Sequence, residues 1–144
     1  MRVETQLSAF LENRAGVLAD VAADLARHGI SVRALTVANL VDHAIVRLVV
    51  SEPQKALHLL GDRGVLVVTS PVLAVDMPDE AGALASIAKR LGRVGVNIEY
   101  AYGSSPVGGG RAAVYLHVSD LTKARRALAE GRRGRRRRSG RRAR

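Results

Sequence analysis

The chain has 144 residues, a formal net charge of +10 and only four aromatic residues, so its core must be built from Ala, Val, Leu and Ile. It contains no cysteine, which excludes a disulfide framework, a thiolate metal site and a cysteine nucleophile. No apolar run approaches the roughly 20 residues that cross a bilayer, and the start of the chain lacks a signal-peptide pattern. We therefore expect a cytoplasmic protein without a membrane span.

The positive charge is concentrated at the C-terminus. Residues Arg132 to Arg144 include nine arginines and no acid, whereas the preceding chain has 14 basic and 13 acidic residues. Arginine mixed with Gly and Ser cannot bury an apolar core, so we expect residues 131–144 to form a disordered tail. Such a tail would bind RNA, DNA or an anionic membrane through phosphates in a salt-sensitive way, or it is a solvated extension without a function.

The chain contains one pattern twice. Eight residues recur 66 positions later as the same type, namely Ala15, Gly16, Leu18, Ala19, Ala22, Leu25, Arg27 and Gly29, which match Ala81, Gly82, Leu84, Ala85, Ala88, Leu91, Arg93 and Gly95. A second block, which includes Val46, Leu48, Val50 and Ser51, recurs 68 positions later as Val114, Leu116, Val118 and Ser119. We interpret the chain as a duplicated module, in which a site in one copy has a counterpart in the other.

Each copy begins with a strand and a helix. Residues Thr5 to Leu11 alternate, with Leu7, Ala9 and Leu11 on one face, which predicts a half-buried strand. Helical spacing follows, with an apolar face of Leu18, Val21, Ala22 and Leu25, and in the second copy of Leu84, Ile87, Ala88 and Leu91. We expect Asn13 and Asp79 to cap the N-termini of these helices, and Gly29 and Gly95 to end them.

The remaining pattern of each copy predicts two strands, a helix and a strand. The predicted strands are Ser31–Ala38, Ala44–Val50 and Val65–Val68 in the first copy, and Asn97–Gly103 and Ala112–Val118 in the second. Helices are predicted to start at Ser51-Glu52-Pro53 and at Ser119-Asp120. No fourth strand is evident in the second copy, because residues 133–136 read Arg-Gly-Arg-Arg. One sheet edge there is uncovered unless the first half or another subunit pairs with it.

These elements predict an α+β protein made of two ferredoxin-like βαββαβ modules in tandem, with antiparallel sheets and helices on one face. We place the modules at residues 1–69 and 70–130, followed by the tail at 131–144. Thr69, Ser70 and Pro71 form a connection too short for a flexible linker.

The candidate site is the strand-to-helix turn, which occurs twice. It comprises Asn13, Arg14, Ala15, Gly16, Val17 and Leu18 in the first copy and Asp79, Glu80, Ala81, Gly82, Ala83 and Leu84 in the second. A helix N-terminus offers free backbone N–H groups and partial positive charge to a carboxylate, and a nearby Asn or Asp suits an ammonium group. The alternative is structural: Asn13 and Asp79 are caps, and the glycines permit close helix–sheet packing.

The same turns resemble the motif of the ACT domain, in which a polar residue, a small residue, Gly and Leu open a helix of a βαββαβ unit. Gly29-Ile30-Ser31-Val32 and Gly95-Val96-Asn97-Ile98 are similar to the family's entry into its second strand. The family usually has Pro where this chain has Ala15 and Ala81. The resemblance implies a regulatory module that binds a small amino acid at the turns, with Asn97 and Ile98 contributing. It also implies a homodimer that acts on an enzyme of amino-acid metabolism.

Other residues give weaker signals. Tyr100 and Tyr102 are predicted to share a strand face with Ile98, and Tyr115 to share one with His117. We expect these rings to pack within the protein rather than stack on bases. The four histidines lack ligand spacing, so we predict no metal site and no cofactor, and no acid–base constellation indicates an enzyme. The alternative function is a nucleic-acid-associated adaptor that acts through the tail, with the folded body as a dimerisation module.

Overall fold

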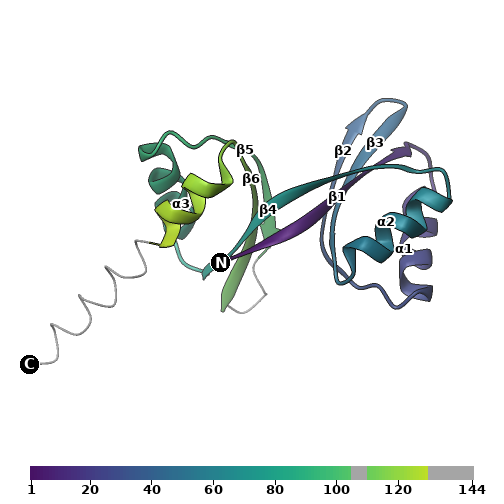
Figure 1. The fold of residues 1–144 in the computed structure, drawn as a ribbon, viewed down its shortest axis with the longest axis horizontal. Coiled ribbons are helices and arrows are strands. Elements are labelled where there is room, and N and C mark those ends of the chain that lie inside the picture. The colour runs from purple at the N-terminus through teal and green to yellow at the C-terminus, as the bar shows by residue number, and fades with distance from the viewer. Residues whose placement is uncertain (105–109, 130–144) are drawn as a thin grey trace, which may run out of the picture. The chain divides into compact units, whose positions relative to one another are not determined.

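A computed structural model describes residues 1–104 and 110–129, which form two compact units (Figure 1). The first unit is Val3–Pro71, and the second consists of Met1–Arg2 together with the described residues from Val72 onward. The predicted tail and most of the loop between the last two strands lie outside the described residues, so the prediction of disorder stays a prediction.

The order of the elements is that of a duplicated βαββαβ chain. They are β1 (Arg2–Glu12), α1 (Val17–Arg27), β2 (Val32–Leu40), β3 (His43–Val50), α2 (Pro53–Asp62), β4 (Leu66–Pro78), α3 (Ala83–Arg93), β5 (Ile98–Ser104), β6 (Arg111–Val118) and a last helix at residues 121–129. No helix in the described part of the chain is long and apolar enough to cross a membrane.

The first unit has the strand order β2-β3-β1-β4, and β3 runs antiparallel to both β1 and β2. Both helices, α1 and α2, cover the same face of this sheet (Figure 1). The alternation predicted for β1 is confirmed, because Leu7, Ala9 and Leu11 are buried in the core under the helices. Val21, Leu25, Ala56 and Leu60 fill that core from the helices.

The second unit repeats this arrangement and confirms the predicted ferredoxin-like α+β fold. Its strands follow the order β4-β6-β5, with β6 antiparallel to both neighbours. Leu73 and Val75 of β4 pack against Ile87 and Leu91 of α3, and the last helix adds Ala124 and Leu128. Each copy therefore buries one stripe of each helix on one face of its sheet.

The start of the chain occupies the place of the fourth strand in the second unit. Strand β1 lies next to β4 in the sheet order, and its first residue, Arg2, together with the preceding Met1, belongs to this unit. Met1 packs against the core of the second unit, and Nη1 of Arg2 lies 3.0 Å from Oδ2 of Asp76. The edge left open by the sequence pattern is therefore covered by residues of the same chain.

Strand β4 corrects the prediction that a short connection separates the modules. It runs without a break from Leu66 to Pro78, so the connection expected at Thr69–Pro71 is part of a strand. Its residues up to Pro71 belong to the first unit, and those from Val72 belong to the second. One strand thus serves as the last strand of one module and the first strand of the next.

The C-terminal glycines act as predicted. Gly29 and Gly95 have φ values of +70° and +71°, a region that favours glycine. In each case the next residue donates its N–H across the helix end, from Ile30 to the carbonyl of Leu25 and from Val96 to that of Leu91. This pattern satisfies carbonyls that the last helical turn leaves without partners.

The helix faces differ from the prediction at one charged and four apolar positions, and two of the latter are Ala22 and Ala88, which are exposed. Leu18 and Leu84 are 42% and 51% exposed, whereas Asp24 is completely buried beside Leu25. The buried carboxylate of Asp24 pairs with Arg27 from the same helix and with Arg63 after α2. A buried charge is tolerated only when it is paired, so these arginines compensate for the loss of water around Asp24.

Removal of both arginines tests this interpretation. We expect the double variant Arg27→Ala/Arg63→Ala to lose about 3 kcal/mol of unfolding free energy, because Asp24 is then left buried without a partner. Urea unfolding at neutral pH measures the loss. The matched control is Arg14→Ala, which breaks the exposed pair with Glu12 and should cost less than about 1 kcal/mol. Equal costs would contradict a special role for Asp24.

Candidate ligand-binding site

Both strand-to-helix turns end on a glycine in the left-handed conformation. Gly16 and Gly82 are the N-cap residues of α1 and α3, with φ values of +90° and +87°, and no side chain caps either helix. A Cβ atom built at either glycine would meet nothing within 4 Å. The predicted caps Asn13 and Asp79 are therefore wrong. So is the idea that the glycines permit close packing, because it is the backbone conformation that requires them.

The helix N-termini carry backbone donors without acceptors. In α1 the N–H groups of Leu18 and Ala19 have no acceptor among the described residues, and the same holds for Leu84 and Ala85 in α3. Such groups, together with the helix dipole, place partial positive charge at the start of a helix. Each turn therefore presents two adjacent donors that suit a carboxylate.

Asn13 is used to hold the hairpin between β2 and β3. Its Nδ2 donates to Oδ1 of Asn39 (2.9 Å) and to the carbonyl of Val41 (2.8 Å), and its backbone N–H donates to Asp42 (3.0 Å). Both donor positions of the amide are thus occupied. In the second copy the backbone N–H of Asp79 makes the matching contact with the carbonyl of Gly110 at 3.1 Å.

The second unit contains a hollow of about 400 Å³ beside the start of α3, which is open to solvent and is called the cavity below. It is lined by Met77, Leu84, Ala101, Tyr102, Gly103, Ala112 and Val114. Leu84 is the predicted site residue in this lining, and its side chain is half exposed there. Ala101 and Gly103 lie on the helix-covered face of β5, because they pair with the core residues Leu116 and Val114.

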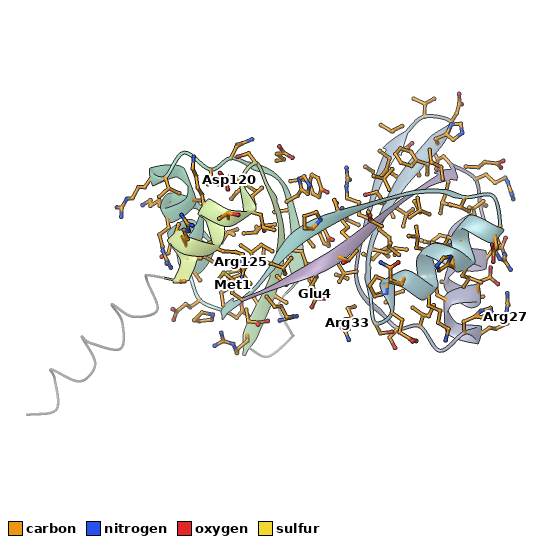
Figure 2. The ribbon with its side chains drawn as sticks, in the orientation of Figure 1. Met1, Glu4, Arg27, Arg33, Asp120 and Arg125 are labelled. Carbon is orange, nitrogen blue, oxygen red and sulfur yellow. The ribbon has the colours of Figure 1, made fainter. Side chains whose placement is uncertain are left out.

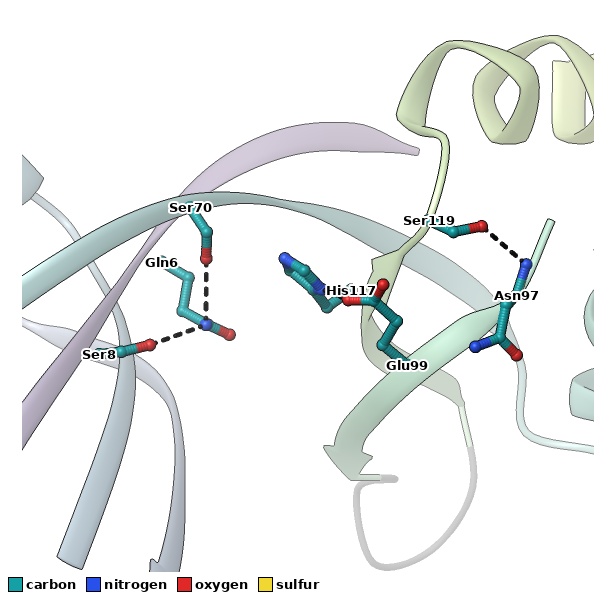
Figure 3. Close-up of polar contacts among 7 residues, drawn as sticks. All are labelled: Gln6, Ser8, Ser70, Asn97, Glu99, His117 and Ser119. Atoms are coloured by element: carbon teal, nitrogen blue, oxygen red, sulfur yellow. Dashed lines mark hydrogen bonds and ion pairs between the residues drawn. The ribbon is translucent and has the colours of Figure 1, made fainter.

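The predicted site residues Asn97 and Ile98 lie at the start of β5, at the end of the strand that is far from the cavity. The backbone N–H of Asn97 donates to Oγ of Ser119 at 3.0 Å (Figure 3). In turn, the backbone N–H of Ser119 donates to the carbonyl of Asn97. Ile98 packs against the core. Since a strand rises about 3.3 Å per residue, Asn97 is roughly 15 Å along β5 from Tyr102. Neither Asn97 nor Ile98 belongs to the cavity lining.

A β-bulge separates Ile98 from the tyrosines. Ile98 pairs with Val118 and Tyr100 pairs with His117, so Glu99 is an extra residue on β5. The bulge turns Tyr100 and Tyr102 to the face opposite Ile98, which makes the predicted shared face wrong. It also brings Oε2 of Glu99 to 2.7 Å from Nδ1 of His117 (Figure 3).

The aromatic rings of the second unit stack on each other. Tyr100 lies on His117 with ring centroids 4.7 Å apart, and Tyr102 lies on Tyr115 at 5.4 Å. Such offset pairs add packing energy within a sheet, which supports the interpretation that these rings are structural. No group of three His, Asp or Glu side chains in the described residues could hold a metal ion.

The first unit has a bulge at the same position. The register of β2 against β3 shifts between Val32 and Ala34, so Arg33 is the extra residue. Nη1 of Arg33 lies 3.9 Å from Oε1 of Glu4 (Figure 2). The two copies thus keep the bulge but place opposite charges on it, Arg33 in the first and Glu99 in the second.

Comparison with known proteins identifies the family. The model of an ACT domain pair matches residues 1–132. The chain belongs to the ACT domain pair family. ACT domains are regulatory modules that bind amino acids, and this pair has the ferredoxin-like fold described above.

Solved structures agree with this assignment. The crystal structure of protein BT0572 from Bacteroides thetaiotaomicron is 36% identical, with a TM-score of 0.85, and the match covers 90% of this chain and 89% of that one. Two regulatory subunits of aspartate kinase share the fold. That from Thermus thermophilus is 20% identical (TM-score 0.67, 90% and 97% covered), and that from Thermus flavus is 18% identical (TM-score 0.62, 90% and 93% covered). No curated protein matches the ACT pair significantly.

Most of the cavity lining was not predicted from the sequence. Val114 belongs to the hydrophobic core and Met77 packs against it, so neither indicates a binding site, and Ala101 and Gly103 carry no functional group. One signal was present in the repeat itself, because Ala101 and Gly103 replace larger residues at the matching positions of the first copy.

Substitution at Gly82 tests the backbone requirement of the turn. We expect Gly82→Ala to cost about 1 kcal/mol of unfolding free energy and Gly82→Val to cost more, because a Cβ disfavours positive φ. Gly82→Asn should be tolerated best of the three, since Asn adopts positive φ more readily than Ala or Val. Urea unfolding measures all three.

The matched control is Gly92→Ala in the same helix, at an exposed position without a positive φ or a close neighbour. It should stabilise the protein by up to about 1 kcal/mol, because Ala is the better helix former. Similar effects of Gly82→Ala and Gly92→Ala would show that the left-handed cap is not required.

Proposed function

We propose that this ACT domain pair is a non-catalytic regulatory protein that binds a small free amino acid at its strand-to-helix turns. The observation that carries the proposal is the cavity beside Leu84, at the point where the N–H groups of Leu84 and Ala85 have no acceptor in the described residues. A carboxylate bound there would accept charge-assisted hydrogen bonds from the helix N-terminus. The rest of the ligand would then extend toward the cavity.

The charges around the turns support an amino acid rather than a simple anion. Asp79 and Glu80 give the second turn two acidic side chains, whereas the first turn has Asn13 and Arg14. Acidic groups attract the ammonium of an amino acid, while the helix N-terminus attracts its carboxylate. The two opposite charges of one zwitterion therefore match two neighbouring features of the second turn.

A regulatory role follows from how ligand binding acts on the ACT pair. A ligand that binds the ordered module stabilises it by mass action, and any partner that prefers the ordered state is then favoured. The fold shared with regulatory subunits of aspartate kinase supports an enzyme of amino-acid metabolism as that partner.

A homodimer is the second part of this proposal. Strand β2 is the edge of the sheet in the first unit, and Leu35, Val37, Leu40 and Val41 are 44–84% exposed there. An unpaired strand edge with apolar side chains is a template for pairing with another chain. The adaptor function through the arginine-rich tail lies outside the described residues and stays a prediction.

Binding of free amino acids tests the proposal. Isothermal titration calorimetry of the full chain against the proteinogenic amino acids should find at least one that binds. The corresponding amino-acid amide should bind about 10- to 100-fold more weakly, because it lacks the charged acceptor for the helix donors. The corresponding amine without any carboxyl group serves as a second control. Absence of binding by every amino acid, or equal binding of acid and amide, would contradict the proposal.

A further inference from the structure

Two residues that line the cavity of the second unit are replaced by larger residues at the matching positions of the first unit. The offset of 66 residues aligns Ala101 with Leu35 and Gly103 with Val37, while Leu84 aligns with Leu18. The second copy thus has a methyl group and a hydrogen where the first copy has two branched side chains. The difference is confined to the strand that lines the cavity.

The larger residues of the first unit occupy the equivalent face. Leu35 and Val37 pair with Leu48 and Val46, which are core residues under the helices. Ala101 and Gly103 have the same relation to the core of the second unit. Leu35 and Val37 are 44% and 50% exposed, so their side chains stand in the region that corresponds to the cavity.

The pairing of β5 with β6 requires glycine at position 103. A Cβ at this position would collide with the carbonyl oxygen of Ala113 and would lie 3.0 Å from Cα of Val114. Strands β5 and β6 therefore approach each other too closely for any other residue. Glycine at position 103 is therefore required by the contact with the β6 backbone, and Ala101 is the lining position of β5 where a larger residue can be introduced.

We propose that the second unit alone holds the ligand of this ACT pair, and that the ligand is an amino acid with an uncharged aliphatic side chain. The proposal rests on the function proposed above and names the repeat and the ligand class. In the first unit Leu35 and Val37 take the place that the ligand side chain would need.

The chemistry of the lining selects the ligand class. Met77, Leu84, Ala112 and Val114 are apolar, and no charged side chain of the described residues lines the cavity. A charged ligand side chain would lose its water there without gaining a partner. A volume of about 400 Å³ lies at the lower end of the range for small-molecule sites. Each methylene that a ligand buries there should strengthen binding about fourfold.

Reciprocal substitutions between the repeats test the proposal. In isothermal titration calorimetry of the full chain against valine, leucine, isoleucine and methionine, we expect one site per chain. Aspartate and lysine should bind at least tenfold more weakly than the best of these. Ala101→Leu copies the first repeat into the second and should weaken binding tenfold or more. The matched variant Leu35→Ala copies the second repeat into the first and should change the dissociation constant less than twofold.

A second matched pair keeps the test valid if Ala101→Leu does not fold, which circular dichroism will show. Leu84→Ala and Leu18→Ala remove half-exposed leucines at matching positions. We expect Leu84→Ala to enlarge the cavity and to shift the preference from valine toward methionine at least threefold, in line with the value of a methylene. Leu18→Ala should leave the preference unchanged.

Three results would overturn the inference while leaving the proposed function intact. They are two sites per chain, wild-type affinity in Ala101→Leu together with an unchanged preference in Leu84→Ala, or a preference for charged amino acids. A second copy of the chain in the cavity would appear as self-association in analytical ultracentrifugation that Ala101→Leu abolishes, and this too would overturn it. No heat with any amino acid would instead contradict the proposed function itself.

Discussion

The left-handed glycine at the start of α1 and of α3 is the constraint on which the candidate site depends. It lets the chain enter each helix without a side-chain cap, because Gly16 and Gly82 are themselves the N-cap residues. A capping Ser or Asp would satisfy the first N–H groups of the helix and close them to a ligand. With glycine there, two donors stay open in each copy, and a partial positive charge remains at a surface turn.

Duplication provided two such turns, and later substitutions made them different. The bulge, the helix-ending glycines and the left-handed caps are kept in both copies. The residues that face the turns are not, since Leu35 and Val37 of the first copy are Ala101 and Gly103 in the second. A module whose backbone donors are preserved but whose neighbouring side chains vary can keep a carboxylate site while changing, or losing, specificity for the rest of the ligand.

The two units are also linked by the strands they share. Strand β4 begins in the first unit and ends in the second. Met1 and Arg2, at the start of the chain, belong to the second unit. The core of the second unit therefore includes a residue from the start of the chain.

Local sequence patterns determined the repeat, the type and order of the elements, the core alternation of Leu7, Ala9 and Leu11, and the glycines that end the helices. These features depend on residues close together in the chain, so the periodicity of apolar residues and the backbone preferences of glycine are sufficient to predict them. The tertiary structure decided which residues close the second sheet, because Met1 and Arg2 lie more than seventy positions from Asp76 in the sequence. It also placed Tyr100 and Ile98 on opposite faces through a bulge. The site divides in the same way. Its turns were evident from the repeated motif, whereas the cavity beside Leu84 is lined by residues of β4, α3, β5 and β6 that only the tertiary structure brings together.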